Sequence, residues 1–472
     1  MNNKAKSIVK NLYYTVAANF ATLGISILLN LFVPKLLGVT EYSYWQLYVF
    51  YSSYVGFLHF GWIDGIYLKI GGEEYENLDK KNLGSQFWYL TLLEVLISFG
   101  VILWALFVLP DGNKATILMM TAIVSIITIM KTYILYIFQS TNRIKEYAQL
   151  SRNDRYLYVL FISVYFVLGG RNFFWLITMD ILSKLIMLIW GMTRVSDLLK
   201  QPVTKLKKLF PEIIDNINIG SKLMLSSIAS MLIIGTIRMF VERKWTIETF
   251  GKLSFTLSIS NMFLTFINAV GVVMFPLLRR TNQEKLPSLY ITLRNLFVPM
   301  TYLILVFYGP ARYIISLWLP EYADSLMFMG ILFPMVVYEG RMSLLVNTYL
   351  KTLRQEKTIL LVNIITLIVT VIVGYFIVFI VGNLTLAVVL IIFSLALRCN
   401  LAELLLGRVM ESKLLKAQTL ETILTAIFII ANLLLPIWQS VVVYVVAFML
   451  YLVLTHKKLI SSTKEFIQLV KN

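Results

Sequence analysis

The sequence predicts an all-α protein that crosses a membrane about fourteen times, and three observations lead to this prediction. Of the 472 residues, 58% are hydrophobic and only 14% are charged, whereas soluble domains are about 45–50% apolar and about 25% charged. The mean hydropathy is +0.78. The apolar residues form repeated runs of roughly 20 residues, the length at which a helix crosses a bilayer core about 30 Å thick. These runs lack the alternation of barrel strands, so we expect helices.

Fourteen candidate spans follow one another along the chain. The first is too long for the apolar core of a signal peptide and begins a series of similar runs, so we treat it as mature structure. The fifth span and the last two are short or closely spaced, which leaves twelve or thirteen spans as alternatives. The spans cover residues 12–34, 44–68, 85–109, 115–138, 156–170, 172–192, 217–240, 253–277, 289–318, 325–349, 358–381, 384–406, 420–436 and 438–455.

Basic residues are distributed unequally between the two sides of these spans. With the N-terminus placed in the cytoplasm, 28 of the 42 Lys and Arg residues fall on the inner side, 7 on the outer side and 7 within spans. The positive-inside rule predicts such a bias when both termini are cytoplasmic. The net charge of +17 is therefore attributed to orientation and to contact with anionic lipid headgroups, not to nucleic-acid binding.

No signature of a catalytic or cofactor-binding domain is found in the sequence. The longest loop, about 193–216, is too short for a folded domain, and no Walker loop, G-x-S-x-G or H-E-x-x-H motif occurs. Two histidines and one cysteine, Cys399, supply neither a zinc ligand set nor an intrachain disulfide. We therefore expect a protein that is not an enzyme and uses no cofactor or metal. The last segment, 457–472, is expected to form an amphipathic helix at the membrane surface.

Polar side chains recur at helical spacing in four spans. Such a stripe occupies one helix face, where it either joins helices to one another or lines a hydrated cavity. The occurrence of four stripes favours a shared cavity. The stripes are Thr15, Asn19, Thr22, Ser26 and Asn30 in the first span, Thr121, Ser125, Thr128, Thr132, Tyr136 and Gln139 in the fourth, Ser227, Ser230 and Arg238 in the seventh, and Ser254, Ser258, Asn261, Thr265 and Asn268 in the eighth.

The second and eighth spans are similar to each other. The segment EYSYWQLYVFYSSYVGFLHFGWIDGIYLK at 41–69 aligns without gaps on ETFGKLSFTLSISNMFLTFINAVGVVMFP at 248–276, an offset of 207 residues. This spacing and the shared orientation are those of two parallel six-helix repeats. They predict an N-terminal lobe at 1–209 and a C-terminal lobe at 210–406, followed by two accessory helices and the tail at 407–472.

With these features, the sequence resembles the polysaccharide repeat-unit flippases of the multidrug, oligosaccharidyl-lipid and polysaccharide exporter superfamily. The likeness lies in a first helix that bears Asn, Ser and Thr, followed by LLGVTEYSYWQLY at 36–48 and FGWIDGIYLKIGG at 60–72, with TIETFGKLSF at 246–255 as the second-half counterpart. Family members often have Gly where this chain has Ser43–Tyr44, and Gly251 keeps it in the second copy. The resemblance implies two lobes around a cavity lined by helices one, two, seven and eight.

The implied function is transport of an undecaprenyl-pyrophosphate-linked oligosaccharide from the inner to the outer leaflet of a bacterial plasma membrane by alternating access, for O-antigen, capsule or another surface polysaccharide. The implied partners are this lipid-linked substrate, the bilayer and polysaccharide polymerase machinery. In the related lipid II flippases, two additional helices line a groove for the lipid tail, and the last two spans here correspond to them. Those flippases carry arginines on helix one, where this chain has Thr, Asn and Ser, and this departure weakens the transfer of their headgroup site and of their substrate to this chain.

Three alternative functions remain open. A cation-coupled drug exporter of the same superfamily would favour a cavity rich in carboxylates, whereas the cavity candidates here are mostly basic. A membrane polysaccharide polymerase or ligase would need a sizeable external loop to hold catalytic groups, and no such loop is predicted. A scaffold role is expected to survive removal of the cavity cations.

Charged residues within the predicted spans are candidates for function, because each is costly to insert into a bilayer. A pyrophosphate group needs cations, and polar side chains can hold sugars. Structural pairing is the alternative for Lys131 and for Arg398, which could pair with Glu339 or Glu403. Glu339 and Arg341 face different directions because they are two residues apart. The candidates for substrate contact are Lys131, Arg398, Arg238, Arg341, Glu339, Asn19, Asn30, Asn261 and Asn268.

Four further residues are candidates for gating or ion coupling. His59 and Asp64 lie in the second span, where a change of protonation can couple transport to a proton gradient. Asp180 and Lys184 lie four residues apart in the sixth span, so an intrahelical ion pair is the simpler expectation for them. The remaining span cations, Lys222, Arg294 and Arg312, lie near span ends and are expected to extend toward the membrane surface.

Overall fold

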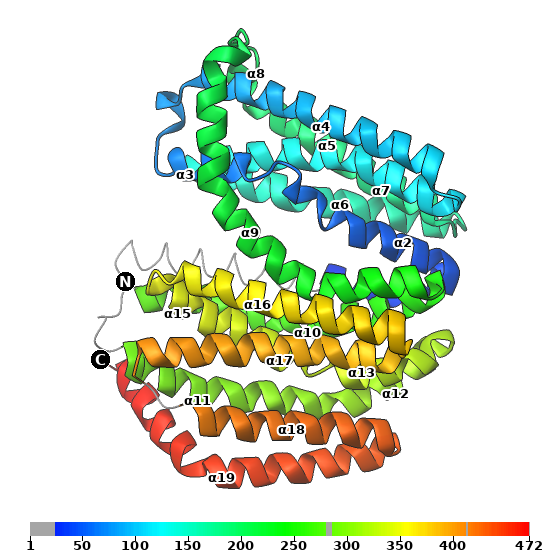
Figure 1. The fold of residues 1–472 in the computed structure, drawn as a ribbon, viewed down its shortest axis with the longest axis vertical. Coiled ribbons are helices and arrows are strands. Elements are labelled where there is room, and N and C mark those ends of the chain that lie inside the picture. Colours follow the sequence, from blue (N-terminus) through cyan, green and yellow to red (C-terminus); the bar gives the residue numbers. More distant parts are fainter. Residues whose placement is uncertain (1–23, 280–285, 412–413, 472) are drawn as a thin grey trace. The chain divides into compact units, whose positions relative to one another are not determined.

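The computed structural model describes the backbone of residues 24–279, 286–411 and 414–471, and the side chains of these ranges outside 265–279 and 469–471. Within these ranges every regular element is a helix and no strand is present (Figure 1). The prediction of an all-α protein is therefore confirmed.

Nine helical segments of the described chain are long and apolar enough to cross a membrane, or ten if one bent helix pair is a single span. These helices mark a membrane-embedded protein. The expected number of fourteen is not confirmed. The nine segments are Lys80–Val108, Gly112–Ser140, Phe173–Arg194, Leu206–Lys244, Leu286–Trp318, Glu356–Val381, Leu384–Val409, Leu415–Leu434 and Ile437–Gln468.

The surface of α4 (Lys80–Val108) illustrates why a membrane is needed. Only 17% of its most apolar window is buried inside the protein. The exposed side chains include Leu96, Phe99 and Phe107. An apolar surface of this kind is unfavourable in water and is matched by lipid chains.

Two compact units divide the chain, and each is described by itself. One unit comprises Leu36–Ile228, and the other comprises Ala229–Asn472 together with the segment up to Lys35. The helix α9 (Leu206–Lys244) contributes its first part to the former and its last part to the latter. The lobe boundaries predicted after residues 209 and 406 stay predictions.

In the unit Leu36–Ile228, α5 (Gly112–Ser140) is the central helix. Its most apolar window is 61% buried, and it packs against five of the other helices of this unit. Ile127, Tyr133 and Ile134 belong to the hydrophobic core around it. The other helices here are α2 (Val39–Ser52), α3 (Trp62–Lys69), α4, α6 (Ile144–Val167), α7 (Phe173–Arg194), the short α8 (Ser196–Leu199) and the first part of α9.

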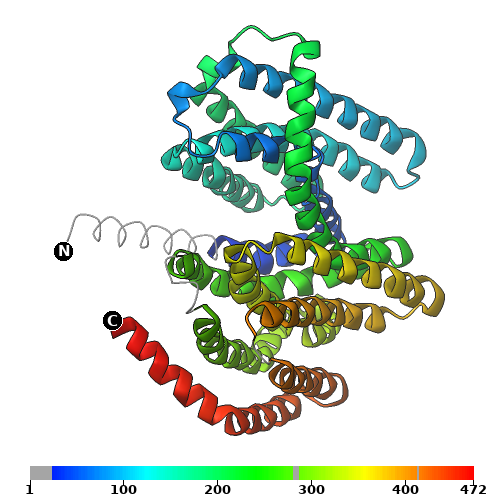
Figure 2. The ribbon, with the colours of Figure 1, turned by 60° about the vertical axis from the view of Figure 1, so that its left-hand side comes forward.

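The other unit contains the remaining helices. Both accessory helices belong to it: α18 (Leu415–Leu434) packs against α13 and α19, and α19 (Ile437–Lys471) also packs against α11 (Figures 1 and 2). The other helices are α10 (Ile247–Arg279), α11 (Leu286–Ile304), α12 (Tyr308–Trp318), α13 (Leu326–Leu332), α14 (Met335–Arg341), α15 (Asn347–Thr352), α16 (Glu356–Tyr375) and α17 (Leu384–Val409), with the last part of α9 and the helical segment Gly24–Leu37 as far as Lys35.

The C-terminal helix is longer than predicted. The amphipathic helix expected at 457–472 continues directly from the last span, because α19 runs from Ile437 to Lys471 without a break. Figure 2 shows this helix, drawn in red, as a curved rod. No Pro or Gly interrupts residues 437–471, so nothing in the sequence ends the helix at the predicted membrane surface.

The second predicted span, 44–68, is wrong as a continuous helix. The helix α2 ends at Ser52, a short 3₁₀ turn follows at Val55–Phe57, and α3 begins at Trp62. Phe60 and Gly61 both have left-handed backbone conformations, with φ of 54° and 86°. Such conformations end a right-handed helix, and Gly61 adopts its own without steric cost. Apolar composition alone did not reveal this break.

The tenth predicted span, 325–349, is also not a single straight helix. The segments Pro320–Leu332 and Met335–Thr352 meet at an angle of 42°. Pro334 stands at the joint and cannot donate the backbone hydrogen bond that a continuous helix needs. A π-helical turn at Met342–Val346 follows the bend, and such turns are frequent at functional sites.

Candidate functional site

A buried ion pair joins α5 to α6. The ammonium of Lys131 donates to the carboxylate of Asp154, and only 9% of either side chain is exposed. Because α6 begins at Ile144, Asp154 lies inside a helix and not in the loop that the sequence predicted before residue 156. Lys131 is therefore balanced by a structural partner that the sequence reasoning missed.

A second, partly buried network lies on α2 and α7, two helices that pack against α5. The carboxylate oxygen Oδ2 of Asp180 accepts from the hydroxyl of Tyr48 and from Nζ of Lys184, each at 2.5 Å. The predicted intrahelical pair of Asp180 and Lys184 is thus confirmed. The helix α7, which carries Asp180 and Lys184, packs against both α5 and α6. Two ammonium groups and two carboxylates therefore hold α2, α5, α6 and α7 together with no net charge.

His59 and Asp64 meet at the break between α2 and α3. Nδ1 of His59 accepts from the backbone N–H of Gly61 at 3.0 Å, which leaves Nε2 as the nitrogen that faces Asp64, with its Oδ2 3.9 Å away. Both residues are buried. The two gating candidates are thus neighbours at the point where the span is interrupted, although their roles stay a proposal.

The α3 segment approaches α9 very closely at its glycines. A Cβ placed on Gly65 would lie 2.0 Å from the carbonyl oxygen of Asn216, and one placed on Gly220 would lie 2.0 Å from the carbonyl oxygen of Gly61. No real Cβ tolerates such distances. The glycines therefore allow backbone-to-backbone contact, as small residues do between membrane helices, and they fix the broken span against α9.

In the other unit, Arg398 of α17 is bound on two sides. Its Nη2 donates to both carboxylate oxygens of Glu339, at 2.7 Å and 2.6 Å. Its Nη1 donates to the hydroxyl of Ser230 at 2.7 Å. The expected pairing with Glu339 is confirmed. The side chain of Glu339 is 22% exposed and that of Arg398 only 5%, so the carboxylate forms the more open edge of this pair.

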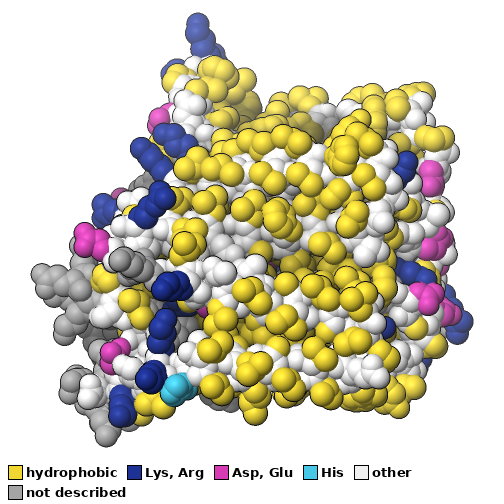
Figure 3. Space-filling model, turned by 60° about the horizontal axis from the view of Figure 1, so that its bottom comes forward, with side chains coloured by type: hydrophobic (Ala, Val, Ile, Leu, Met, Phe, Trp, Pro, Cys, Tyr) yellow, Lys and Arg dark blue, Asp and Glu magenta, His cyan; other side chains and the backbone are white. Residues whose placement is uncertain are grey.

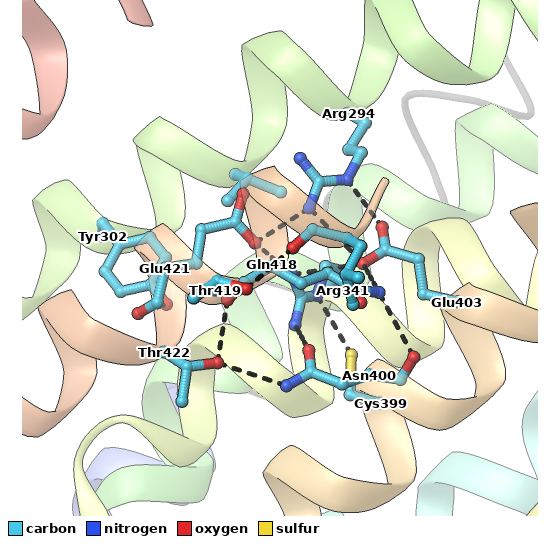
Figure 4. Close-up of polar contacts among 12 residues, drawn as sticks. Arg294, Tyr302, Arg341, Cys399, Asn400, Glu403, Gln418, Thr419, Glu421 and Thr422 are labelled. Carbon is cyan, nitrogen blue, oxygen red and sulfur yellow. Dashed lines mark hydrogen bonds and ion pairs between the residues drawn. The ribbon is translucent and has the colours of Figure 1, made fainter. Parts of the chain in front are cut away.

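Arg341 points away from Glu339, as predicted for residues two positions apart, and enters a cluster of four buried charges (Figure 4). Arg294 of α11 and Arg341 of α14 bind Glu403 of α17 and Glu421 of α18. None of the four side chains is more than 3% exposed. The charges sum to zero and join four helices, including the accessory helix α18.

Neutral groups complete the hydrogen bonding of this cluster. Gln418 donates to Glu403 at 2.8 Å, the hydroxyl of Tyr290 donates to Glu403 at 2.7 Å, and Asn400 accepts from Arg341 at 2.7 Å. A buried ionic network is stable only when such partners are present. The expectation that Arg294 extends toward the membrane surface is wrong, because Glu403 and Glu421 hold its guanidinium inside the protein.

The other candidates for substrate contact take varied positions. Arg238 donates to the hydroxyl of Ser254 at 2.9 Å and stacks over the ring of Phe250. Asn30 is half-buried and Asn261 is exposed. Asn19, and the side chain of Asn268, lie outside the described residues. Lys222 and Arg312 were expected, like Arg294, to extend toward the membrane surface. Lys222 is exposed, and Arg312 donates to the hydroxyl of Tyr308 at 3.1 Å.

A site with an excess of basic side chains lies between α11, α18 and α19. Two adjoining cavities of about 380 Å³ and about 170 Å³ share Arg294, Asn295, Ala417 and Lys458 in their walls. Lys416 lines the smaller cavity and Lys457 the larger one. Within the described ranges, no ion pair involves Lys416, Lys457 or Lys458. We call these two cavities and their three lysines the basic pocket.

Polar and apolar groups complete the walls of the basic pocket. Ser461, Ser462 and Glu465 of α19 line the larger cavity. Ser462 accepts from Asn295 at 3.1 Å, and Glu465 accepts from Thr292 at 2.5 Å. The space-filling view from the side of α19 shows a broad apolar surface with a row of Lys and Arg side chains along one edge, and a smaller group of basic and acidic side chains at the opposite edge (Figure 3).

Sequence reasoning missed several of these groups, although some signals were available. Glu94 is the only charged residue of its predicted span, 85–109, and the rule that selected Lys131 also applies to it. Glu421 lies one residue inside the predicted start of the span 420–436, and the three pocket lysines were counted as loop charges that face lipid headgroups.

No protein-family model matches the sequence, and the search of curated proteins gives no match. The geometry of the described residues therefore has to carry the functional argument.

Proposed function

We propose that the chain is a membrane transporter that moves an anionic lipid-linked oligosaccharide, of the undecaprenyl-pyrophosphate type, from the inner to the outer leaflet by alternating access. The observation that carries this proposal is the basic pocket. Three lysines from two helices line one cavity system and have no carboxylate partner among the described residues. An anionic group is the ligand that such a site favours.

The chemistry of the pocket fits a phosphate-bearing headgroup better than a cationic drug. Lys416, Lys457 and Lys458 supply ammonium donors, while Asn295 and the serines of α19 supply neutral donors. The larger cavity, at about 380 Å³, falls within the range of small-molecule sites. Basic pockets between helix ends at the cytoplasmic surface are also where anionic lipid headgroups bind in membrane proteins.

The apolar surface of α19 gives the lipid tail a place outside the pocket. Val442, Leu450 and Leu454 are exposed on this helix, and Leu454 also lines the smaller cavity. A polyprenyl chain has the same preference for the bilayer core as these side chains. A headgroup in the pocket and a tail along α19 would therefore satisfy both parts of an amphipathic substrate.

The other buried cations have a different role in this proposal. Lys131, Arg294 and Arg341 have carboxylate partners and are nearly inaccessible, so we assign them to holding helices together. Arg398 is the exception that fits substrate contact, because its partner Glu339 is partly exposed. Arg398 meets phosphate only after it releases Glu339, and this exchange is a step that alternating access can drive.

The test is leaflet exchange of a fluorescent undecaprenyl-pyrophosphate oligosaccharide in proteoliposomes. We expect the triple variant Lys416→Gln, Lys457→Gln, Lys458→Gln to exchange the lipid about tenfold or more slowly than the wild type, because charge-assisted hydrogen bonds contribute about 1.5–3 kcal/mol each. The matched control changes Lys351, Lys357 and Lys464, three exposed lysines of the same predicted side that do not line the pocket. Equal loss in both triple variants would show a general effect of charge and would count against the pocket.

A second comparison separates this function from cationic drug export. Exchange of the pyrophosphate lipid by the wild type, with no efflux of a cationic dye from the same vesicles, is the expected result. Dye efflux without lipid exchange would favour the drug exporter instead. Absence of both activities with several such glycans would move the proposal to another substrate class.

A further inference from the structure

Glu94 is a carboxylic acid in the middle of α4 with no partner. It is 0% exposed, and neither of its carboxyl oxygens has a hydrogen-bond partner among the described residues. It stands 14 residues after the start of α4 and 14 before its end, at Lys80 and Val108, so it lies as far from the membrane surfaces as this helix allows. No network already described uses this group.

The helix α5 supplies the surface that Glu94 meets. Ser98 of α4 donates to the carbonyl of Ala122 at 2.8 Å and lies 3.0 Å from Ser125. One turn beyond Glu94 in the other direction, the hydroxyl of Thr91 contacts the sulfur of Met130. These two contacts bracket Glu94 and set an antiparallel register, which places Thr128 opposite it.

The hydroxyl of Thr128 is unsatisfied in the same way as the carboxyl of Glu94. Its hydroxyl oxygen is buried and has no hydrogen-bond partner among the described residues. Two polar groups that face each other across one helix pair therefore both lack partners. Buried polar groups are nearly always paired in native proteins, so an exception calls for a ligand, a proton or a state in which the pair closes.

Among the described residues, no cation on the helices packed against α4 compensates a carboxylate at this position, and Glu212 of α9, which accepts from Asn82 near the start of α4, is itself negative. On α5, Lys131 is bound to Asp154 and Tyr133 donates to the carbonyl of Leu83. On α8, Asp197 pairs with Lys80 at the far end of α4. The other titratable side chains of these helices are Lys81 and Tyr89 on α4, of which Tyr89 donates to Thr204, and Lys114 and Tyr136 on α5.

From this arrangement we infer that Glu94 and Thr128 form a proton-binding site inside the membrane. An ionised carboxylate without donors or a counter-charge is strongly disfavoured in an apolar interior, whereas the neutral acid carries its own donor, and the unpartnered hydroxyl of Thr128 on the facing helix is an acceptor for it. The proton comes from water and returns to water, and only the O–H bond of the acid forms and breaks. Its use in coupling rests on the proposed transport function.

A coupling role follows from where the charge changes. The α4–α5 pair lies next to the Lys131–Asp154 pair, because Lys131 is on the same helix as Thr128, one turn further along. Loss of the proton from Glu94 would introduce a negative charge near the Lys131–Asp154 pair, whose own two charges are balanced. The helix pair must then open to water, so proton release and a conformational change are linked.

The first test needs no transport assay. Infrared spectroscopy of the purified protein in lipid detects the carbonyl stretching band of a protonated carboxylic acid. We expect this band at neutral pH in the wild type and its loss in Glu94→Gln, which keeps the shape of the side chain. Glu94→Asp should shift the band instead of removing it, which serves as the second variant if Glu94→Gln folds poorly.

The result that would overturn the inference is an identical acid band in the wild type and in folded Glu94→Gln, since Glu94 would then be ionised. A band that appears only when Na⁺ is removed would also contradict the inference, because it would show that Glu94 binds Na⁺ in place of a proton. Neither outcome depends on whether the chain transports a lipid.

The second test measures transport. If the lipid exchange assay reports activity, we expect an inward proton gradient to accelerate the wild type and to leave Glu94→Gln unaffected. An equal response of both proteins would remove Glu94 from coupling and leave the proposed substrate standing. Lipid exchange that is absent in the wild type, together with the acid band, would refute the substrate and keep the proton site.

Discussion

Arg341 and Glu421 join the bent helix α14 to the accessory helix α18, with Nη1 of the arginine 2.5 Å from Oε2 of the glutamate. Both side chains are at most 1% exposed. The same carboxylate oxygen accepts from Arg294 at 2.8 Å. The last two membrane helices are therefore attached to the rest of their unit by charge as well as by apolar contacts.

Glu421→Gln should destabilise the protein strongly. The change leaves Arg294 and Arg341 with only Glu403 to balance two buried positive charges, and removing one partner of a buried ion pair costs about 3–5 kcal/mol. Thermal unfolding in detergent, followed by intrinsic fluorescence, measures the loss. Glu356→Gln, at an exposed position, is the control, and a similar midpoint for both variants would contradict the structural role.

The Lys131–Asp154 pair allows a test that separates structure from substrate binding. Lys131→Met alone should destabilise the protein by about 3–5 kcal/mol, because it strands the buried carboxylate of Asp154. The double variant Lys131→Met, Asp154→Leu should recover most of this stability, since an apolar pair can replace a buried ion pair.

Lipid exchange by that double variant then reports on function. If Lys131 only holds helices together, we expect the double variant, once its stability is recovered, to exchange the lipid at nearly the rate of the wild type. A folded double variant that has lost transport would return Lys131 to the group of substrate-binding residues.

Gly65→Ala should disturb the contact between α3 and α9. The new methyl group would lie 2.0 Å from the carbonyl oxygen of Asn216, and backbone cannot move aside as a flexible side chain can. We expect a loss of about 1–3 kcal/mol or more, as for other overpacked sites. Gly56→Ala is the matched control, because nothing lies within 4 Å of a Cβ there. Equal thermal midpoints for the two variants would show that α3 moves freely relative to α9.

The fold class was predictable because lipid imposes two simple requirements on a chain, apolar length and internal backbone hydrogen bonds. A helix that is broken within the membrane has the same apolar composition as a continuous one, so composition does not distinguish the two. The break at Phe60–Gly61 depends on two left-handed residues, and the bend at Pro334 lies within an apolar run. Hydropathy does not report either feature, although Pro334 was a visible local signal.

The charged residues show the same limit. The pairs of Asp180 with Lys184 and of Arg398 with Glu339 were predictable from helical spacing and from the small number of charges inside spans. The partners of Lys131 and Arg341 were not, because Asp154 and Glu421 lie at predicted span edges and reach their partners only through tertiary packing. The candidate roles of His59 and Asp64 stay predictions, now with a shared location.

A pH-dependent contribution to stability is expected from Asp197, outside the predicted spans. Although partial burial alone would raise its pKa, hydrogen bonds from Lys80 at 2.8 Å and Tyr75 at 2.7 Å hold the pKa of this carboxyl below its ordinary value. A depressed pKa in the folded state stabilises the protein above the unfolded pKa, which is about 3.9 for Asp. The contribution disappears as the pH falls through the lower, folded value.

Asp197→Asn should therefore lower the thermal midpoint at neutral pH, and the difference from the wild type should vanish as the pH falls below about 4. Because 47% of the Asp197 side chain is exposed, solvent screening limits the effect to about 1 kcal/mol or less. The measurement is the unfolding midpoint of both proteins across the acid range, at low and at high salt. High salt should reduce the neutral-pH difference, since the pair with Lys80 is accessible to ions. A difference that persists unchanged in acid would show that the amide disturbs packing around α8, and that the charge of Asp197 contributes nothing to stability.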